Sequence, residues 1–363
     1  MYTHISRYLV GLSGLLLCAS ISEAQTSVDR YDVSSMPDNS VVYSLPLTRV
    51  AVTIQVKRVE EAPGQFYIYA PKYLGVSEVI SEPSVRYELE SADISTYGVA
   101  DTDNKFAVKF KTGTTAPFVY LTPDGILCAI NAEYVTEDTS AEQPAEKGSA
   151  PDTSRRLPSM SAEYVQATTD AKRAEIAARE IYRVRESRVN IVSGDAEQPF
   201  PDGQAMKLAM EGLDRQEKLL TEMFLGSRDV AVSRKVVRNL MPDSTSTVVA
   251  FRMSDAEGLL PADDLRGEPV YMKTEVLEKA PELSERDAAR KARRMKGVVY
   301  NVPGKARVSL LFRGKVIADN VVEVAQLGTQ EALEPNNFNT RRGTISVTFY
   351  PATGAIKSVK GQE

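Results

Sequence analysis

The stretch VVYSLPLTRVAVTIQVKRVEEA, residues 41–62, places the strongest constraint on the fold. From residue 50 onward Val50, Val52, Ile54 and Val56 alternate with small or polar residues. A period of two residues is typical of a strand with one buried face, because successive side chains of a strand point to opposite faces. The chain must therefore supply an apolar layer that covers this strand. Further strand patterns occur at 85–100, 105–111, 118–123 and 126–135.

Two helical patterns and a second group of strands follow. In residues 169–188 an apolar stripe with helical spacing comprises Ala174, Ala177, Ile181 and Val184. Residues 202–226 have a similar stripe, comprising Ala205, Leu208, Ala209, Leu213, Gln216, Leu220, Met223 and Phe224. Asp202 suits the N-cap of this second helix and Gly226 its C-terminal end. Strand patterns return from residue 229, and a short helix is predicted at 284–295.

The two short hairpin patterns resemble each other. YLTPDGILCAIN, residues 120–131, and FYPATGAIKSVK, residues 349–360, each consist of a strand, a proline-containing turn, a glycine and a second strand. This likeness hints at two related β-units. Together the patterns predict a β-rich α+β protein with two antiparallel, sandwich-like β-domains and an inserted helical pair.

The chain of 363 residues is long enough for two or three domains. Residues 136–161 lose all periodicity and are rich in Pro, Ser, Thr, Ala and Glu, which indicates a linker or long loop. The predicted division is a signal peptide at 1–24, a flexible arm at 25–40, a β-domain at 41–135, the linker at 136–161, a helical segment at 162–226 and a second β-domain at 227–363.

Residues 1–24 have the pattern of a secretory signal, with Arg7 before an apolar run and small residues at Ser22 and Ala24. We expect a mature chain that starts at Gln25, is exported to the periplasm or the outer membrane, and has no transmembrane segment. The alternative is a lipoprotein signal with Cys18 acylated. Leu17 argues against it, because a small residue is preferred before the acylated cysteine.

Removal of 1–24 restricts the available chemistry. The only histidine, His4, lies in that segment, and Cys128 is then the sole cysteine of a chain without tryptophan. Histidine-dependent triads, zinc sites of His or several Cys, haem held by His and internal disulfides are therefore not expected. We expect no cofactor and no metal, and Cys128 is interpreted as a buried structural thiol. The net charge of −5 provides no general attraction for nucleic acid.

The aromatic run GQFYIYAPKYLGV, residues 64–76, has two interpretations. It is either a binding platform that presents Tyr67 and Tyr69, or a tyrosine-rich helix that packs with Phe66 and Tyr73. The packing interpretation is favoured, although Pro71 counts against a smooth helix. Leu74 and Gly75 suit the end of a helix.

A second candidate is the basic helix at 284–295, where Arg286, Arg290 and Arg294 form a ridge at a spacing of four residues. The ridge could bind phosphate groups of envelope lipid. Alternatively, it is a solvated face whose late basic residues complement the helix dipole. DTDNKF at 101–106 superficially matches a calcium loop but lacks the later oxygen ligand and glycine, so a polar loop is favoured.

Several of these segments resemble the DUF4831 family of exported proteins, known mainly from Bacteroidota. The matching residues are YSLPLTRVAVTIQV at 43–56, YAPKYLGV at 69–76, LTPDGIL at 121–127 and, in the tail, VVYNVPGKARVSL, VAQLG and TFYPATGAIKSV. The resemblance implies export and makes 64–76 an element of the family. It implies no activity and no catalytic residues.

The sequence predicts a non-catalytic cell-envelope protein that binds or scaffolds another envelope component, either a protein or a glycan. Two alternatives stay open. One is a carbohydrate-active hydrolase with a carboxylate pair, for which no spacing singles out two residues. The other is a glycan- or lipid-binding module.

Overall fold

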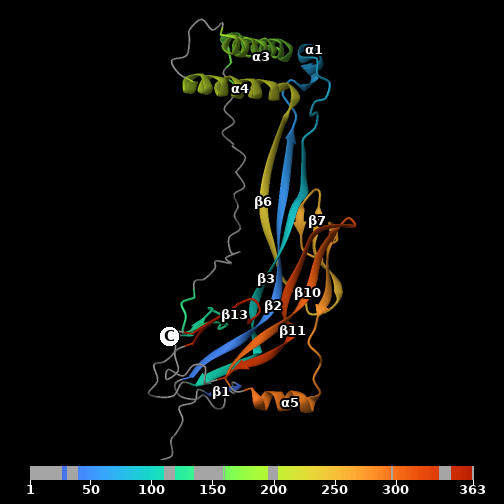
Figure 1. Ribbon diagram of the computed structural model, residues 1–363. Coiled ribbons are helices and arrows are strands. Elements are labelled where there is room, and N and C mark those ends of the chain that lie inside the picture. Colours follow the sequence, from blue (N-terminus) through green and yellow to red (C-terminus); the bar gives the residue numbers. More distant parts are fainter. Residues whose placement is uncertain are drawn as a thin grey trace, which may run out of the picture.

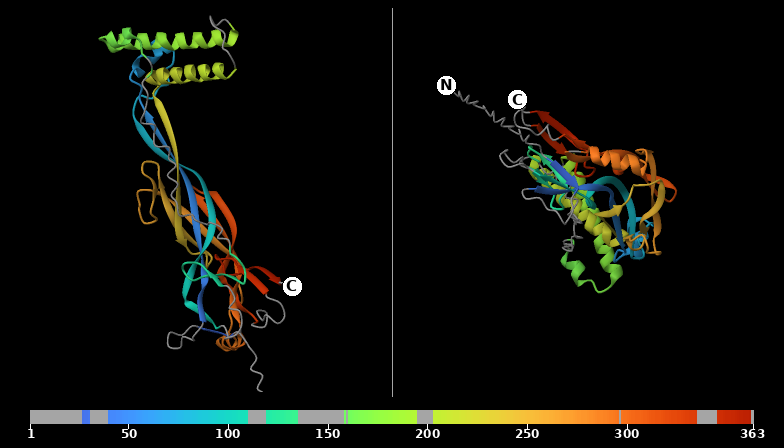
Figure 2. Two further views of the ribbon diagram at one scale, coloured as in Figure 1. Left: turned by 90° about the vertical axis from the view of Figure 1, so that its left-hand side faces the viewer. Right: turned by 90° about the horizontal axis from the view of Figure 1, so that it is seen from below.

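The computed structural model describes residues 27–30, 40–109, 119–134, 158, 160–194, 203–295, 297–334 and 345–361. The predicted signal peptide and most of the predicted linker lie outside these residues, as do Asp202 and Cys18. The molecule is elongated. Figures 1 and 2 show a group of helices across one end, which we call the head, and the helix α5 across the other end.

The elements follow the predicted order. The strands are β1 (Ser27–Arg30), β2 (Ser40–Ala62), β3 (Ser84–Lys109), β4 (Val119–Leu121), β5 (Leu127–Ile130), β6 (Ser227–Leu240), β7 (Ser246–Ser254), β8 (Gly258–Leu260), β9 (Glu268–Glu278), β10 (Val298–Phe312), β11 (Lys315–Leu333), β12 (Ile345–Phe349) and β13 (Ile356–Gly361). The helices are η1 (Tyr67–Tyr69), α1 (Ala70–Leu74), α2 (Ala162–Gln166), α3 (Asp170–Ser193), α4 (Gly203–Leu225) and α5 (Glu285–Arg294). The β-rich α+β class is confirmed.

The long strand pattern forms the axis of the molecule. β2 contains 23 residues, so it extends over roughly 75 Å at the usual rise of a strand. It pairs with β3 on one side and with β6 on the other, in the order β1-β3-β2-β6. The predicted alternation is confirmed, because Val50, Val52, Ile54 and Val56 are at most 3% exposed.

Strands from distant parts of the sequence share sheets and cores. β6 follows the helices but pairs with β2, and β12 near the C-terminus pairs with β5. A second sheet, in the order β11-β10-β9-β7-β8, covers the buried face of β2 and forms the main core with it. A third sheet, β13-β12-β5-β4, covers a smaller core around Tyr43, Phe106 and Phe349. Part of the predicted flexible arm also pairs: residues 27–30 form β1 against the end of β3.

The hairpins β2–β3 and β10–β11 each contain a register shift of the same size at or next to a proline. In the first, the pairing passes from Ser44–Lys105 to Pro46–Ala100, which leaves residues 101–104 opposite Leu45 alone. In the second, it passes from Val302–Thr329 to Gly304–Val324, which leaves 325–328 opposite Pro303 alone. Proline has no backbone N–H and cannot donate to the strand ladder. Each hairpin therefore forms a bulge of four residues against one.

The first bulge corrects one detail of the sequence interpretation. DTDNKF at 101–106 was expected to be a loop between two strands. Residues 84–109 instead form one continuous strand, β3, and 101–104 are its bulge. The pairing resumes at Lys105, because the residues that follow share a core with Tyr43.

Each long hairpin is followed in the sequence by a short hairpin whose turn accepts a hydrogen bond from it: β4–β5 follows β2–β3, and β12–β13 follows β10–β11. Ser44 N–H donates to the carbonyl of Gly125 in the β4–β5 turn at 2.8 Å. Asn301 N–H donates to the carbonyl of Gly354 in the β12–β13 turn at 3.1 Å. Ser44 and Asn301 each lie two residues before the proline of their strand. The likeness of the two short hairpins thus extends to units that each consist of a long and a short hairpin.

The two units meet in a buried polar cluster, which we call the proline junction. Its centre is Thr48, which is fully buried. The amide of Gln326 accepts from Thr48 N–H at 3.0 Å and donates to Thr48 C=O at 2.9 Å. The Thr48 hydroxyl donates to Ala352 C=O at 2.9 Å and accepts from Ala325 N–H at 3.0 Å. These bonds join β2 to the second bulge and to the β12–β13 turn.

The aromatic run lies in the head, where packing explains its buried members. Phe66 and Ala70 are fully buried, and the Phe66 ring lies 5.5 Å from that of Phe224 in α4. The four predicted stripe residues of α3 are all buried in the same core. Pro71 lies in the first turn of α1, where a missing N–H costs no helical hydrogen bond, and Gly75 ends the helix with φ +67°.

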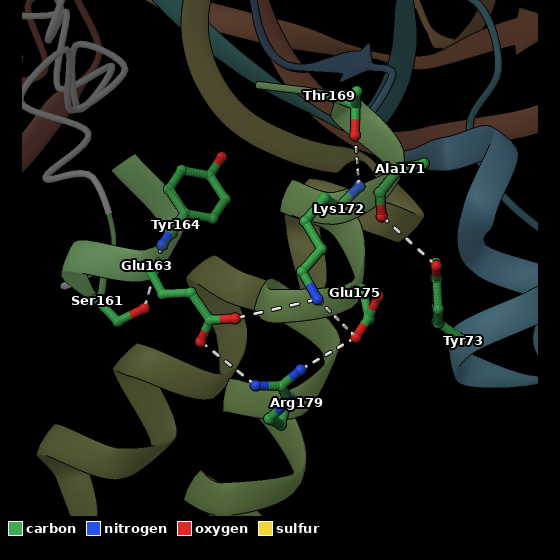
Figure 3. A network of polar contacts seen from close by, with 9 residues as sticks. All are labelled: Tyr73, Ser161, Glu163, Tyr164, Thr169, Ala171, Lys172, Glu175 and Arg179. Carbon is green, nitrogen blue, oxygen red and sulfur yellow. Dashed lines mark hydrogen bonds and ion pairs between the residues drawn. The ribbon is translucent and has the colours of Figure 1, made fainter. Parts of the chain in front are cut away.

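Capping side chains and ion pairs fix the helices of the head. Figure 3 shows Ser161 and Thr169 at the N-caps of α2 and α3, where their hydroxyls accept from backbone N–H groups. Lys172 and Arg179 of α3 both pair with Glu163 and Glu175 (Figure 3). Gly226 ends α4 as predicted, with φ +87°. The predicted stripe of α4 is only partly buried, since Leu208 is 63% exposed.

We expect Thr48→Val to lower the free energy of unfolding by about 1–3 kcal/mol, because it leaves the half-buried Ala325 N–H and Ala352 C=O without their partner. Urea unfolding followed by far-UV circular dichroism measures the change. Thr53→Val on the same strand is the matched control, since Thr53 is only half-buried, and it should change stability by less than about 0.5 kcal/mol. Equal effects of the two substitutions would contradict the role of the junction.

We expect Phe66→Ala to lower the stability of the head by about 3–5 kcal/mol, the usual cost of removing a buried aromatic ring. Ile68, two residues away, is 70% exposed, and Ile68→Ala should be nearly neutral. Melting followed at 222 nm reports mainly on the helices. Unchanged melting of the Phe66 variant would support the binding-platform interpretation instead.

Candidate functional site

A groove of about 680 Å³ lies between α5 and the two bulges, and we call it the α5 groove. Asp101 and Asn104 come from the bulge of β3, while Ala325, Gln326 and Gly328 come from the bulge of β11. The groove is therefore a direct result of the two proline irregularities. Its volume falls within the range of about 300–1,000 Å³ that is usual for ligand sites.

The floor of the groove consists of buried apolar side chains and of amides that already have partners. Leu45, Phe106 and Val299 are each at most 7% exposed. The Asn301 amide donates to Thr353 C=O at 2.9 Å and to Pro46 C=O at 3.3 Å, and Gln326 is bonded to Thr48 as described. These three apolar side chains and the two partnered amides offer a ligand few free hydrogen-bonding groups, although Asn104, Thr329 and Gln330 also line the groove.

The roof is α5, which stands off from this floor. Its N-cap is Ser284, whose hydroxyl accepts from Asp287 N–H at 3.2 Å. Ala288 and Ala292 line the groove but remain exposed, and no residue of the helix is buried. An apolar helix face usually packs on the layer beneath it. Here the space between the two layers is open.

One cationic side chain anchors α5 to the body of the protein. The Lys291 ammonium donates to Thr329 Oγ1 at 2.6 Å and to Glu331 Oε1 at 2.7 Å, both on β11. Arg293 also lines the groove and has no ion-pair partner among the described residues. On the opposite wall, the carboxylate of Asp101 accepts from Asp103 N–H at 3.0 Å and from the Asn104 amide.

The predicted site residues do not form one site. Arg286, Arg290 and Arg294 are exposed on α5 but do not line the groove, and Arg290 pairs with Asp287. Tyr67 and Tyr69 lie at the other end of the molecule, where α1 lies beside α3 (Figure 1), and Tyr69 packs against the core of the head. Their roles in binding stay predictions.

Sequence reasoning missed Lys291 and Arg293, the basic residues that line the groove. The spacing of four residues drew attention to the neighbouring Arg290 and Arg294. Which basic residues line the groove depends on the face that α5 turns toward the bulges. The helical pattern in the sequence does not predict which face that is. Ala288, Ala292 and Met295, at spacings of four and three residues, share a face of the helix, and all three line the groove.

A second hollow of about 440 Å³ lies between α3 and α4. Its charged side chains bind one another, since Arg185 pairs with Glu217 at 2.7 Å and Arg188 with Asp214 at 3.1 Å. These pairs hold the two helices together and leave little charge for a ligand.

Cys128 is 1% exposed, and burial raises the pKa of its thiol to about 11. A thiol of this kind is unreactive at neutral pH, in agreement with a structural role. Within the described ranges, no group of three or more Asp, Glu, His or Cys side chains lies close enough together to hold a metal ion. None of the helices in that part of the chain is long and apolar enough to span a membrane.

Fold and groove define an elongated, β-rich α+β protein made of two proline-interrupted hairpin units with a helical head. The family described as "Domain of unknown function (DUF4831)" matches residues 39–357, nearly the whole chain. The chain therefore belongs to this family, as the resemblance of its segments implied. Comparisons with curated proteins and with solved structures gave no significant match.

We expect Lys291→Met to loosen α5, because the helix loses its anchor to Thr329 and Glu331 while its other side chains remain unburied. Hydrogen exchange measured by mass spectrometry should show faster exchange of the α5 amides. Arg294→Met is the matched control, since Arg294 is exposed and has no partner among the described residues. Equal exchange in both variants would contradict the anchoring role.

Proposed function

We propose that this chain is a non-catalytic cell-envelope protein that holds another envelope component in the α5 groove. The observation that carries the proposal is the open groove between α5 and the floor beneath it. It leaves Leu283, Ala288 and Ala292 exposed to water, which is unfavourable unless something covers them. Export of the chain rests on the signal-like pattern at 1–24.

The proline junction supports a binding role because it makes the floor rigid. Asn301 and Gln326 take part both in the junction and in the floor, so the floor cannot move without breaking buried hydrogen bonds. A preformed site binds more tightly, since less ordering is needed when the ligand enters. α5, which is held by Lys291 and by Met295 at its C-terminal end, has no buried residue of its own and can adjust to the ligand.

The elongated form supports the scaffolding part of the proposal. The head and the α5 groove lie at opposite ends of the molecule, separated by the long strands (Figure 1). A protein of this form can hold two components apart. The hydrolase alternative receives less support from the groove, because Asp101 is the single carboxylate among its described lining residues, whereas that chemistry requires two.

A pair of variants on α5 tests whether the groove binds an envelope component. Ala292→Trp places a large ring in the groove, whereas Ala289→Trp places the same ring on a residue of α5 that does not line it. Each tagged protein is purified from envelope extract, and the molecules that accompany it are identified by mass spectrometry. We expect the wild type and Ala289→Trp to enrich the same component and Ala292→Trp to lose it. Identical sets from both variants would exclude the groove as the binding site.

A further inference from the structure

We propose that the α5 groove binds the hydrocarbon chain of an anionic amphiphile, with the anionic group at the Arg293 end of α5. This inference rests on the proposed function and specifies the chemistry of its ligand. It assigns the apolar slot to the chain and the cationic rim to the head group.

Apolar side chains line both sides of the slot between α5 and the floor, beside polar ones such as Asn104, Thr329 and Gln330. Leu45, Phe106 and Val299 form the floor, while Ala288, Ala292 and Met295 form the roof. Leu283, which precedes α5, also lines the groove and is 49% exposed. A hydrocarbon chain that enters the slot is itself removed from water, with a gain of about 0.8 kcal/mol for each buried CH₂ group, and it covers the exposed apolar side chains of the roof.

Among the polar residues that line the groove, two amides of the floor favour a hydrocarbon over a sugar. The amides of Asn301 and Gln326 already bond to backbone carbonyl and N–H groups of the junction. They have little capacity left for the many hydroxyls of a glycan, and a hydroxyl buried without a partner is unfavourable. A hydrocarbon chain requires no such partners.

The charges at the rim favour an anion on the α5 side. Arg293 is exposed there with no described partner, and Lys291 lies two residues away. Lys291 binds Glu331, so an anion near both residues meets one free guanidinium and one ammonium that is already neutralised. The Asp101 carboxylate lies on the other wall and repels an anion, which orients the ligand with its charged end toward α5.

Dodecanoate is a suitable probe, compared with hexanoate and with dodecyltrimethylammonium, each below its micelle concentration. Isothermal titration calorimetry of the purified protein should show one site for dodecanoate. Hexanoate should bind at least about tenfold more weakly, because it buries fewer CH₂ groups. The cationic probe, which has the same chain, should also bind at least about tenfold more weakly, because its charge meets Arg293.

Two matched pairs of variants locate the site. Ala292→Trp should weaken dodecanoate binding at least about tenfold, whereas Ala289→Trp should leave it within about twofold. Arg293→Gln should reduce the preference for dodecanoate over the cationic probe, whereas the neighbouring Arg294→Gln should preserve it. Circular dichroism melts show whether each variant is folded. If Ala292→Trp does not fold, Ala292→Val replaces it as a smaller obstruction of the groove.

Three results would overturn the inference: no binding of dodecanoate, equal binding of the three probes, or equal effects of Ala292→Trp and Ala289→Trp. The outcome also separates this inference from the proposed function. If Ala292→Trp abolishes the capture of an envelope component while dodecanoate does not bind, the groove is a binding site for another chemical class. If neither capture nor dodecanoate binding depends on Ala292, both proposals fail.

Discussion

The paired hydrogen bonds between the backbone of Thr48 and the amide of Gln326 hold the two hairpin units together. Gln326 acts here as a third strand would, since it satisfies both the N–H and the C=O of one residue. The need arises because β6 pairs with β2 only from Val50 onward, so the other edge of β2 has no neighbouring strand at Thr48. Residues 278 positions apart in sequence thus complete each other's backbone bonding. An unbonded peptide group at this buried position is unfavourable by about 1–3 kcal/mol.

Close backbone contacts restrict the bulges further. A Cβ atom on Gly328 would lie 1.9 Å from the Val302 carbonyl oxygen, and one on Gly98 would lie 2.0 Å from that of Pro351. Only glycine allows the second bulge to lie against Val302, and only glycine allows the β12–β13 turn to lie against β3. The groove therefore depends on two kinds of residue. Prolines interrupt the ladders, and glycines allow the released backbone to pack closely.

Much of the fold follows from the sequence because local patterns determine it. Alternation predicted the buried face of β2, helical spacing predicted the buried stripe of α3, and glycines marked the ends of α1 and α4. Parts of four segments that resemble the DUF4831 family, YSLPLTRV, VVYNVPG, VAQLG and FYPATG, lie in the strands and turns that meet at the proline junction, whereas YAPKYLGV lies in the head. Their meeting could not be predicted, because a single strand pattern does not identify its partner in a sheet.

The candidate site was less predictable for the same reason. Its floor comes from β2, β3, β10 and β11, and its roof comes from a helix whose orientation depends on the Lys291 anchor to β11. Charge spacing on α5 identified basic residues of the correct helix but on the wrong face for the groove. A residue of the groove becomes recognisable only when the partner strands are known.

The head also has a physical role that does not depend on any ligand. Between the head and the main core, β2, β3 and β6 form a narrow sheet in which Val85 and Val230 are 43% and 47% exposed. A sheet of three strands with so little covered surface depends largely on its backbone ladder, so its ends tend to fray. The head prevents this, because Phe66 N–H donates to Met223 C=O at 2.7 Å and Ile80 N–H to Leu225 C=O at 2.9 Å. These bonds connect α4 to the segment that joins β2 and β3. The core of the head therefore keeps the long strands paired over their whole length. These strands in turn separate the head from the groove.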